Sequence, residues 1–513
     1  MKNQILLLML TSGGTQLSHA QTPPGVQWER SFGGSDADAG SIVKSTSDGG
    51  YILGGYSYSD ISGSKTTSCF GLGDYWVVKL DASGNKQWDQ SCGGNQFDGI
   101  QALQQTSDGG YLLGGISFSD ASGNKASASQ GAGDFWIVRL SASGNKQWDK
   151  TFGGTNLDSL TALSRTSDGG CVLGGTSFSG ISGNKSSAGF GPDSGDYWMV
   201  KLDGNGSKQW EKSFGGNDLD ELHGLQQTSD GGYILGGHSS SGVSGNKTSA
   251  NLGNGTSDYW IVKLDAGGNK QWEKTCGGND VDELYAIQQT IDGGYILGGH
   301  SYSGVSGHKT SGSFGSHDYW VVKLDSNGNK QWDQSCGGED EDRLISVQQR
   351  TDGGYVLGGV SFSGVSGNKT SASGAADSGD YWIVSLDANG NKQSEQSLRR
   401  GYGDEFSRLQ STPDGASVLA GLASSFASAD VDYAVTKLMG LLRFNWSSFG
   451  ADRVYRAQLT GASGANYILH ASTNLVHWRP LATNRAANGV VDFVDAAAAS
   501  FPKRFYRVQP ADN

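Results

Sequence analysis

Three neighbouring segments of this chain gather acidic side chains densely enough to hold a cation. They are Asn217-Asp218-Leu219-Asp220-Glu221, Asn279-Asp280-Val281-Asp282-Glu283 and Glu339-Asp340-Glu341-Asp342-Arg343. Because Ca²⁺ prefers hard oxygen ligands, we predict calcium as the one candidate cofactor. The predicted ligands are Asp218, Asp220, Asp280, Asp282, Asp340 and Asp342. None of the segments has the D-x-[DN]-x-[DN]-G spacing of an EF-hand loop, so the alternative is solvated surface acid.

The same segments supply the candidate residues for binding a larger ligand. These residues are Asp220, Glu221, Asp282, Glu283, Asp342 and Arg343. One aspartate, however, recurs in every copy of a longer repeat, at Asp38, Asp98, Asp158, Asp220, Asp282, Asp342 and Asp404. Such recurrence favours a structural role, in which the carboxylate accepts backbone N–H bonds in the Gly-Gly turn that precedes it.

The longer repeat also contains Ser/Gly/Asn/Lys-rich loops, such as residues 241–257. Loops of this length without regular structure are often functional. Their Ser, Asn and Lys side chains could hydrogen-bond to sugars, and their interspersed Tyr and Phe could stack on them. The alternative is that nearly identical loops only cap the repeating units.

Enzyme motifs are weakly represented. The sequence has neither G-x-S-x-G nor H-E-x-x-H, and few Arg for a sialidase-like cluster. His238 and His300 occupy the same position in adjacent copies, so we do not expect them to converge on a metal. The eight His are scattered along the chain and suggest no copper set. We therefore expect a protein that is not an enzyme.

The elements that position these residues are seven copies of one repeat. It opens with W-x-x-x-[F/C]-G-G at Trp28, Trp88, Trp148, Trp210, Trp272 and Trp332, with Ser394 in the seventh copy. The period is 60 to 62 residues. In the fourth copy, apolar runs predict strands at 222–228, 233–237, 259–265 and 270–275, with Ser229–Gly232 as a hairpin turn. Four antiparallel strands per copy predict one blade, and seven copies predict a seven-bladed β-propeller over residues 21–439.

The phase of the repeats predicts how the ring closes. The first copy begins with an outermost strand, Val26–Phe32, and the seventh ends after its third strand, Asp432–Leu438. We expect the N-terminal strand to complete the last blade, which removes the free sheet edges. In the alternative, Leu441–Trp446 takes that place.

Most aromatic residues and cysteines occupy fixed repeat positions. Twelve of the 14 Trp stand at the D-Y-W position or the opening position, which indicates packing between blades. Cys92, Cys276 and Cys336 stand where other copies have Phe, so we expect buried apolar residues rather than disulfides.

The pattern Tyr-Ile-Leu-Gly-Gly, then Asp-Tyr-Trp-Val-Val-Lys-Leu-Asp, then Lys-Gln-Trp resembles the bacterial secreted β-propeller repeat family and, more loosely, kelch repeats. The resemblance covers residues 26–438 and implies the fold rather than a function. The last copy departs from it at Ser394, Arg399-Arg400, Pro413 and Ala434.

A second module follows the repeats at residues 440–513. Alternating apolar and polar residues predict strands at 456–460, 466–471, 478–482, 490–494 and 504–508, and hence a small antiparallel β-sandwich. Its sequence resembles a small C-terminal domain found on secreted proteins of environmental bacteria, and surface sorting or attachment is a hypothesis for its role.

The N-terminus and the charge indicate where the protein works. Residues 1–20 have the pattern of an export signal, with Lys2, an apolar run at 5–10 and Ser18-His19-Ala20 before Gln21. No later stretch is long and apolar enough for a membrane span.

The net charge of −13 is unevenly distributed along the chain. Residues 441–513 contain eight Lys/Arg and four Asp/Glu, a net +4, so residues 1–440 carry a net −17. This acidic propeller argues against nucleic acid as a partner.

Together these features predict a secreted or cell-surface monomer that acts as a non-catalytic binding scaffold. The expected partner is a polysaccharide or a surface protein. The alternatives are a glycan-active enzyme with its site at the mouth of the central pore, and a purely structural surface protein.

Overall fold

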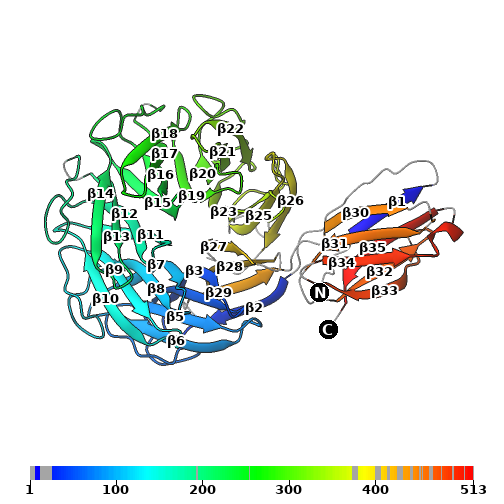
Figure 1. Ribbon diagram of the computed structural model, residues 1–513, viewed down its shortest axis with the longest axis horizontal. Helices are drawn as coiled ribbons and strands as arrows, with labels where there is room; N and C mark the ends of the chain where they lie inside the picture. The colour runs from blue at the N-terminus through cyan, green and yellow to red at the C-terminus, as the bar shows by residue number, and fades with distance from the viewer. Residues whose placement is uncertain are drawn as a thin grey trace.

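The computed structural model describes residues 6–11, 26–191, 194–253, 255–372, 379–398, 406–412, 416–424, 431–438, 443–449, 452, 454–461, 466–474, 476–487, 490–501 and 503–511. Seven sheets, each of four antiparallel strands, stand around one axis (Figure 1). The prediction of an all-β fold with a seven-bladed propeller is therefore confirmed.

Six blades are built from four consecutive strands, from the axis outward, and the seventh is built from β27, β28, β29 and the N-terminal β2. The innermost strands are β3 (Asp38–Ser45), β7 (Asp98–Gln105), β11 (Asp158–Arg165), β15 (Asp220–Gln227), β19 (Asp282–Gln289), β23 (Asp342–Gln349) and β27 (Phe406–Ser411). The second strands are β4 (Tyr51–Ser57), β8 (Tyr111–Ser117), β12 (Cys171–Ser177), β16 (Tyr233–Ser239), β20 (Tyr295–Ser301), β24 (Tyr355–Ser361) and β28 (Ser417–Ser424). The third strands are β5 (Asp74–Leu80), β9 (Asp134–Leu140), β13 (Asp196–Leu202), β17 (Asp258–Leu264), β21 (Asp318–Leu324), β25 (Asp380–Leu386) and β29 (Val431–Leu438). The outermost strands are β6 (Lys86–Cys92), β10 (Lys146–Phe152), β14 (Lys208–Phe214), β18 (Lys270–Cys276), β22 (Lys330–Cys336), β26 (Lys392–Leu398) and β2 (Val26–Phe32).

The N-terminal strand closes the ring as predicted. β2 pairs antiparallel with β29, from Val26 opposite Leu438 to Phe32 opposite Tyr433. The seventh sheet therefore has the order β2-β29-β28-β27. The alternative closing strand is wrong, because β30 (Arg443–Phe449) pairs with β31 of the C-terminal module instead. The last copy departs most from the repeat. Of its residues named above, Arg399, Arg400, Asp404 and Pro413 lie outside the described residues.

The hairpin between the first and second strands of each blade differs in detail from the prediction. In blade four, Thr228 N donates to Gly232 O and Gly231 N donates to Thr228 O, both at 2.9 Å. The loop therefore has three residues, Ser229–Gly231. Gly231 adopts a φ of +81°, and the equivalent glycines of the other described hairpins have φ between +82° and +86°. A turn followed by a left-handed Gly is the usual three-residue hairpin. In this three-residue loop only the Gly needs a positive φ. In the two-residue loop that an Asp-Gly pair also fits, both the Asp and the Gly would need one.

The cores lie between neighbouring blades. The Trp of the D-Y-W position is fully buried in six blades, at Trp76, Trp136, Trp198, Trp260, Trp320 and Trp382. The Tyr beside it reaches the next blade, as where Tyr197 Oη donates to Trp260 O at 3.0 Å. Cys92, Cys276 and Cys336 are buried at the Phe position, and the structure leaves all five cysteines unpaired. The prediction of inter-blade packing by these residues is confirmed.

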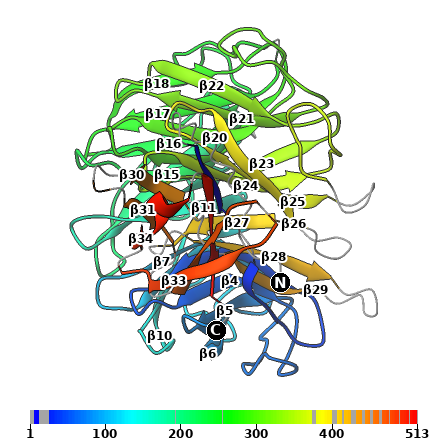
Figure 2. The same ribbon diagram turned by 90° about the vertical axis from the view of Figure 1, so that its right-hand side faces the viewer.

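The C-terminal module contains two small sheets around one apolar core, as expected for a sandwich. One sheet is β30, β31 (Tyr455–Thr460) and β34 (Val490–Asp495), and the other contains β32 (Asn466–Ser472), β33 (Arg479–Arg485) and β35 (Lys503–Pro510). A 3₁₀ helix, η1 (Ala498–Ser500), precedes β35. The module lies beside the ring rather than within it, as Figures 1 and 2 show.

One further strand of this module comes from the N-terminus. β1 (Leu6–Thr11) pairs antiparallel with β35. These residues belong to the predicted export signal, most of which lies outside the described residues, so export stays a prediction. Within the described part of the chain, no helix has the length and hydropathy needed to cross a membrane.

Candidate functional site

One face of the propeller carries both the blade-to-blade connectors and the loops between second and third strands; we call it the loop face. The connectors and these loops lie on the same face because, within a blade, the innermost strand starts beside the end of the second strand. In blade four, for example, Asp220 at the start of β15 pairs with Ser239 at the end of β16. The candidate residues of the three acidic segments therefore lie on this face.

The recurring aspartate is a structural residue of this face, as expected. In blade four, Asp220 is fully buried, and its Oδ2 accepts Gly216 N at 2.7 Å and Ser241 Oγ at 3.0 Å. Asp282 and Asp342 make the equivalent bonds to Gly278 and Gly338. These three aspartates are therefore buried and hydrogen-bonded within the connectors, so their carboxylates are not exposed to a ligand on the surface.

The other predicted calcium ligands lie apart from the buried aspartates. Asp218, Asp280 and Asp340 are exposed on the connectors, where their backbone N–H groups donate to the same serines that hold the buried aspartates. Among the described residues, only Glu221, His223 and His238 form a group of three His, Cys, Asp or Glu side chains whose possible ligand atoms lie within 4.8 Å of one another. Calcium binding stays a prediction, without a gathered set of carboxylates to support it.

The buried aspartates give the stability of the ring a specific pH dependence. Burial, together with the nearby Asp220 carboxylate, raises the pKa of Asp196 from 3.8 to about 7. A raised carboxyl pKa stabilises the folded state below the pKa of the unfolded chain, and that stabilisation is lost as pH rises through the folded value. We expect Asp196→Asn to gain stability relative to the wild type between about pH 4 and pH 7. Melting temperatures of both proteins at pH 4.5 and 7.5 measure this, with Asp218→Asn as the exposed control. A wild-type-to-variant difference that does not change with pH would contradict it.

Histidines and tyrosines of blades four and five form a continuous row on the loop face. We call these residues the histidine row: His223, His238, Tyr285, His300, Tyr302 and His317. Its ring centroids are 5.0 Å apart between His223 and His238, and 4.7 Å between His223 and Tyr285. The row continues from Tyr285 to His300 at 5.3 Å. Four of the eight histidines thus share one site.

Acidic side chains and one arginine bind the histidine row. Glu221 Oε2 lies 2.9 Å from His238 Nε2, and Glu283 Oε2 lies 3.2 Å from His300 Nε2. Arg343 Nε lies 3.3 Å from His317 Nε2. Three of the predicted binding residues, Glu221, Glu283 and Arg343, therefore belong to this site, whereas Asp220, Asp282 and Asp342 do not.

The row combines neutral imidazoles with ionised carboxylates. Burial, and then the neighbouring His238, lowers the pKa of His223 to about 3. Burial, and then His300, lowers the pKa of His317 to about 4. The hydrogen bond from His300 lowers the pKa of Glu283 to about 2. At neutral pH, His223 and His317 are therefore uncharged beside ionised carboxylates, and the Nε2 lone pair of His317 accepts the Nε–H of Arg343.

The sequence predicts that His238 and His300 do not converge on a metal, and this stays a prediction, but the structure brings His238 together with Glu221 and His223. His238 pairs across the sheet with Glu221, and His223 follows Glu221 by two residues on the same strand. Direct cross-strand partners share a face. The hairpin length alone would set Glu221 opposite Ser239; a bulge at His223, between the pairs Leu222–Gly237 and Gly224–Gly236, shifts the register by one residue and sets Glu221 opposite His238. The sequence pattern does not reveal that bulge.

Aromatic side chains form a second feature of the loop face. The residue after each second strand is aromatic in five blades, at Tyr58, Phe118, Phe178, Tyr302 and Phe362, and is Ser240 in blade four. Tyr58 is 45% exposed, Phe118 41%, Tyr302 39% and Phe362 37%. In blades one and two, Tyr58 and Phe118 flank Phe97, with centroids 6.2 and 6.4 Å from it. We call Tyr58, Phe97 and Phe118 the aromatic patch.

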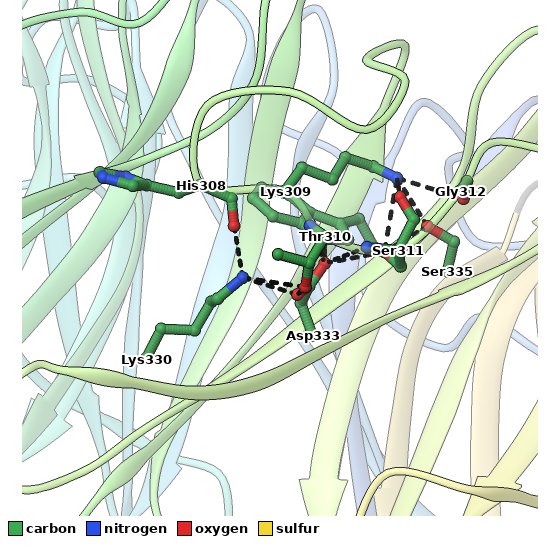
Figure 3. A network of polar contacts seen from close by, with 9 residues as sticks. His308, Lys309, Thr310, Ser311, Gly312, Lys330, Asp333 and Ser335 are labelled. Atoms are coloured by element: carbon green, nitrogen blue, oxygen red, sulfur yellow. Dashed lines mark hydrogen bonds and ion pairs between the residues drawn. The ribbon is translucent and has the colours of Figure 1, made fainter.

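Hydrogen bonds from their own polar side chains hold the Ser/Gly/Asn/Lys loops in place. In blade five, Lys309 turns inward and donates to Ser311 O at 2.9 Å and Ser335 Oγ at 2.7 Å (Figure 3). Asp333 accepts the N–H groups of Thr310 and Ser311 at 3.0 and 2.9 Å. The equivalent lysines are also buried: Lys65, Lys125, Lys185, Lys247 and Lys369. The loops are therefore rigid supports, and their lysines are not available to a ligand.

The centre of the ring holds a cavity of about 180 Å³. Residues of all seven innermost strands line it, including Lys44, His223, Tyr285 and Arg408. Burial and the nearby Arg408 lower the pKa of Lys44 to about 8. His223 and Tyr285 therefore connect the histidine row to the central cavity.

Comparison with known proteins gives no family for this chain. No protein-family model matches the sequence, and no curated protein is significantly similar to it. The WD40 domain of Pan2 from Neurospora crassa is 11% identical, with a TM-score of 0.43 over 79% of this chain and 89% of that one. A puromycin hydrolase is 9% identical, with a TM-score of 0.43 over 84% and 60%. A mutant of the Synechocystis apocarotenoid oxygenase is 12% identical, with a TM-score of 0.35 over 86% and 91%. None of these values supports an inference about activity.

Proposed function

We propose that this chain is a secreted, monomeric and non-catalytic binding protein that holds an extracellular polysaccharide on its loop face. It is proposed to belong to the bacterial secreted propellers with kelch-like blades, and to leave the cell through the export signal at residues 1–20. The observation that carries the proposal is the aromatic side chain repeated around the loop face.

Aromatic rings that recur at one exposed position of the repeat point to an interaction surface more strongly than a single exposed ring does. Four of them are more than a third exposed, whereas the Trp and Tyr of the blade cores are almost fully buried. Flat amphipathic rings offer large contact area at small entropic cost, and the C–H faces of sugar rings fit against them. The repeat spaces these rings from blade to blade, which suits a polymer of repeating sugars better than one small molecule.

The charge of the propeller narrows the class of polysaccharide. Residues 1–440 carry a formal charge of −17. Acidic polymers are repelled by such a surface. The polar side chains of the loops are bound within the loops themselves, so neutral sugars recognised by stacking fit best.

A glycan array with the full chain tests this proposal. We expect binding to a neutral polysaccharide, with no product released on prolonged incubation. Release of shorter sugars would instead support an enzyme acting at the pore mouth. Failure to bind any glycan would overturn the proposal and favour a surface-protein partner or a purely structural role.

The C-terminal module is proposed to attach the protein to the cell surface. Its two sheets have their own apolar core, separate from the blades. Deleting residues 441–513 is expected to release the propeller into the medium without changing its glycan binding. Unchanged secretion and surface display after the deletion would remove this role.

A further inference from the structure

The histidine row contains a group of three side chains that the glycan proposal does not use. One ligand atom from each of Glu221, His223 and His238 lies within 4.8 Å of those of the other two. Glu221 and His238 share a face because they are direct cross-strand partners of β15 and β16. The bulge at His223, between the pairs Leu222–Gly237 and Gly224–Gly236, adds the third side chain to them. The rigid hairpin of blade four therefore holds the group together.

Two ring nitrogens of this group lack hydrogen-bond partners. Nε2 of His223 and Nδ1 of His238 are both shielded from solvent and unpartnered among the described residues. His238 is only 5% exposed. A buried polar atom without a partner costs free energy, and a bound cation or a hydrogen-bond donor would supply the missing partner of these nitrogens.

We propose that Glu221, His223 and His238 bind a divalent first-row transition metal of the zinc class at the mouth of the central cavity. Two imidazoles and one carboxylate are a usual protein ligand set for Zn²⁺, and they leave a further position for an outside ligand. Ca²⁺ and Mg²⁺ prefer oxygen ligands and do not suit this group. His223 lines the cavity of about 180 Å³, so a metal bound there is open to small ligands.

The neighbouring blades show which residue makes the site specific to blade four. Blade five keeps the carboxylate and the histidine, as Glu283 and His300, but has Tyr285 in place of His223. The Tyr285 hydroxyl donates to Glu283 at 2.9 Å, so this position offers no ring nitrogen in blade five. Nδ1 of His300 lacks a partner as Nδ1 of His238 does, and the feature specific to blade four is therefore Nε2 of His223. Blade three has Ser159, Thr161 and Thr176 at the three positions. The repeat itself therefore provides replacements that a blade accepts.

Metal titration of the tag-free full chain tests the proposal. Calorimetry with Zn²⁺ and visible absorption with Co²⁺ should both give one site per chain. His223→Thr, which copies Thr161 of blade three, and Glu221→Gln should each weaken binding by about 100-fold or more, since even outer-shell changes cost about 10–100-fold. Melting temperatures in metal-free buffer check that both variants fold.

His308→Asn is the matched control. His308 occupies a position where four other copies have Asn, at Asn124, Asn184, Asn246 and Asn368. Its Nδ1 bonds to Thr275 O at 2.9 Å, away from the proposed site. The control should bind Zn²⁺ as the wild type does. No Zn²⁺ or Co²⁺ bound by the wild type, or equal affinity in His223→Thr, would overturn the proposal. Because the measurement uses metal alone, it is independent of whether a polysaccharide binds.

Discussion

Deletion of residues 26–32 is expected to abolish cooperative folding of the propeller. These residues form β2, the outermost strand of the blade that also contains the C-terminal strands β27 to β29. The deletion removes Trp28 and Phe32 from the core between the last and first blades. Loss of a large aromatic side chain from a core costs about 3–5 kcal/mol, and the free edge of β29 would also be exposed to other chains. Both effects together approach the whole stability of an ordinary domain, about 5–15 kcal/mol.

Thermal unfolding of the purified proteins measures this effect. Deletion of residues 441–513 is the matched control, because it removes a module with its own core and leaves the β2–β29 pairing intact. The control should keep the main unfolding transition of the ring. A cooperative transition at the wild-type temperature after deletion of residues 26–32 would show that β2 does not close the ring.

Substitution of Trp260 by Ala is expected to lower the free energy of unfolding by about 3–5 kcal/mol. The Trp260 side chain is fully buried between blades three and four. Its ring lies 4.7 Å from that of Tyr197, and Lys247 Nζ stands 5.8 Å from its centroid. The surrounding strands are paired on both sides, so they cannot collapse into the space that the ring leaves.

Trp210→Ala is the comparison for this prediction. Trp210 lies in β14, the outermost strand of blade three, is half-buried, and packs edge-on against Tyr233 at 5.7 Å. Partial burial makes its expected loss smaller, about 1–2 kcal/mol. Urea denaturation of both variants gives the two values. Equal losses would contradict the view that the cores between blades carry most of the stability.

The fold followed from residues that most copies share. Trp, Tyr and Gly-Gly at fixed positions gave the number of blades, the strand order and the closing strand. The hairpin was less accessible, because an Asp-Gly pair fits both a two-residue and a three-residue loop, and only hydrogen bonds such as Gly231 N to Thr228 O distinguish them. The residues of a turn therefore limit the possible loop lengths but do not determine which one forms.

The site depended on residues that copies do not share, and there the sequence was less informative. Asp220 stood beside Glu221 and had the same charge, but one is buried in a turn and the other contacts His238. Strand alternation separates them, since adjacent residues point to opposite faces. His223, Tyr285 and His317 gave no signal individually, because they come from different strands and loops and meet only when blades four and five stand side by side.

The central claim is that shared residues build the ring and that the exposed aromatic rings on its loop face bind a polysaccharide. It is tested most directly by the affinity of the Tyr58→Ala/Phe118→Ala variant for the polysaccharide that the wild type binds. Both side chains are about half exposed, so their removal leaves the blade cores intact. Aromatic contacts of this kind contribute about 0.5–1.5 kcal/mol each beyond their buried area, which predicts binding weakened by about tenfold or more. Ser240→Ala, at the equivalent position of blade four, should bind as the wild type does. Equal affinity of the double variant and the wild type would contradict the account.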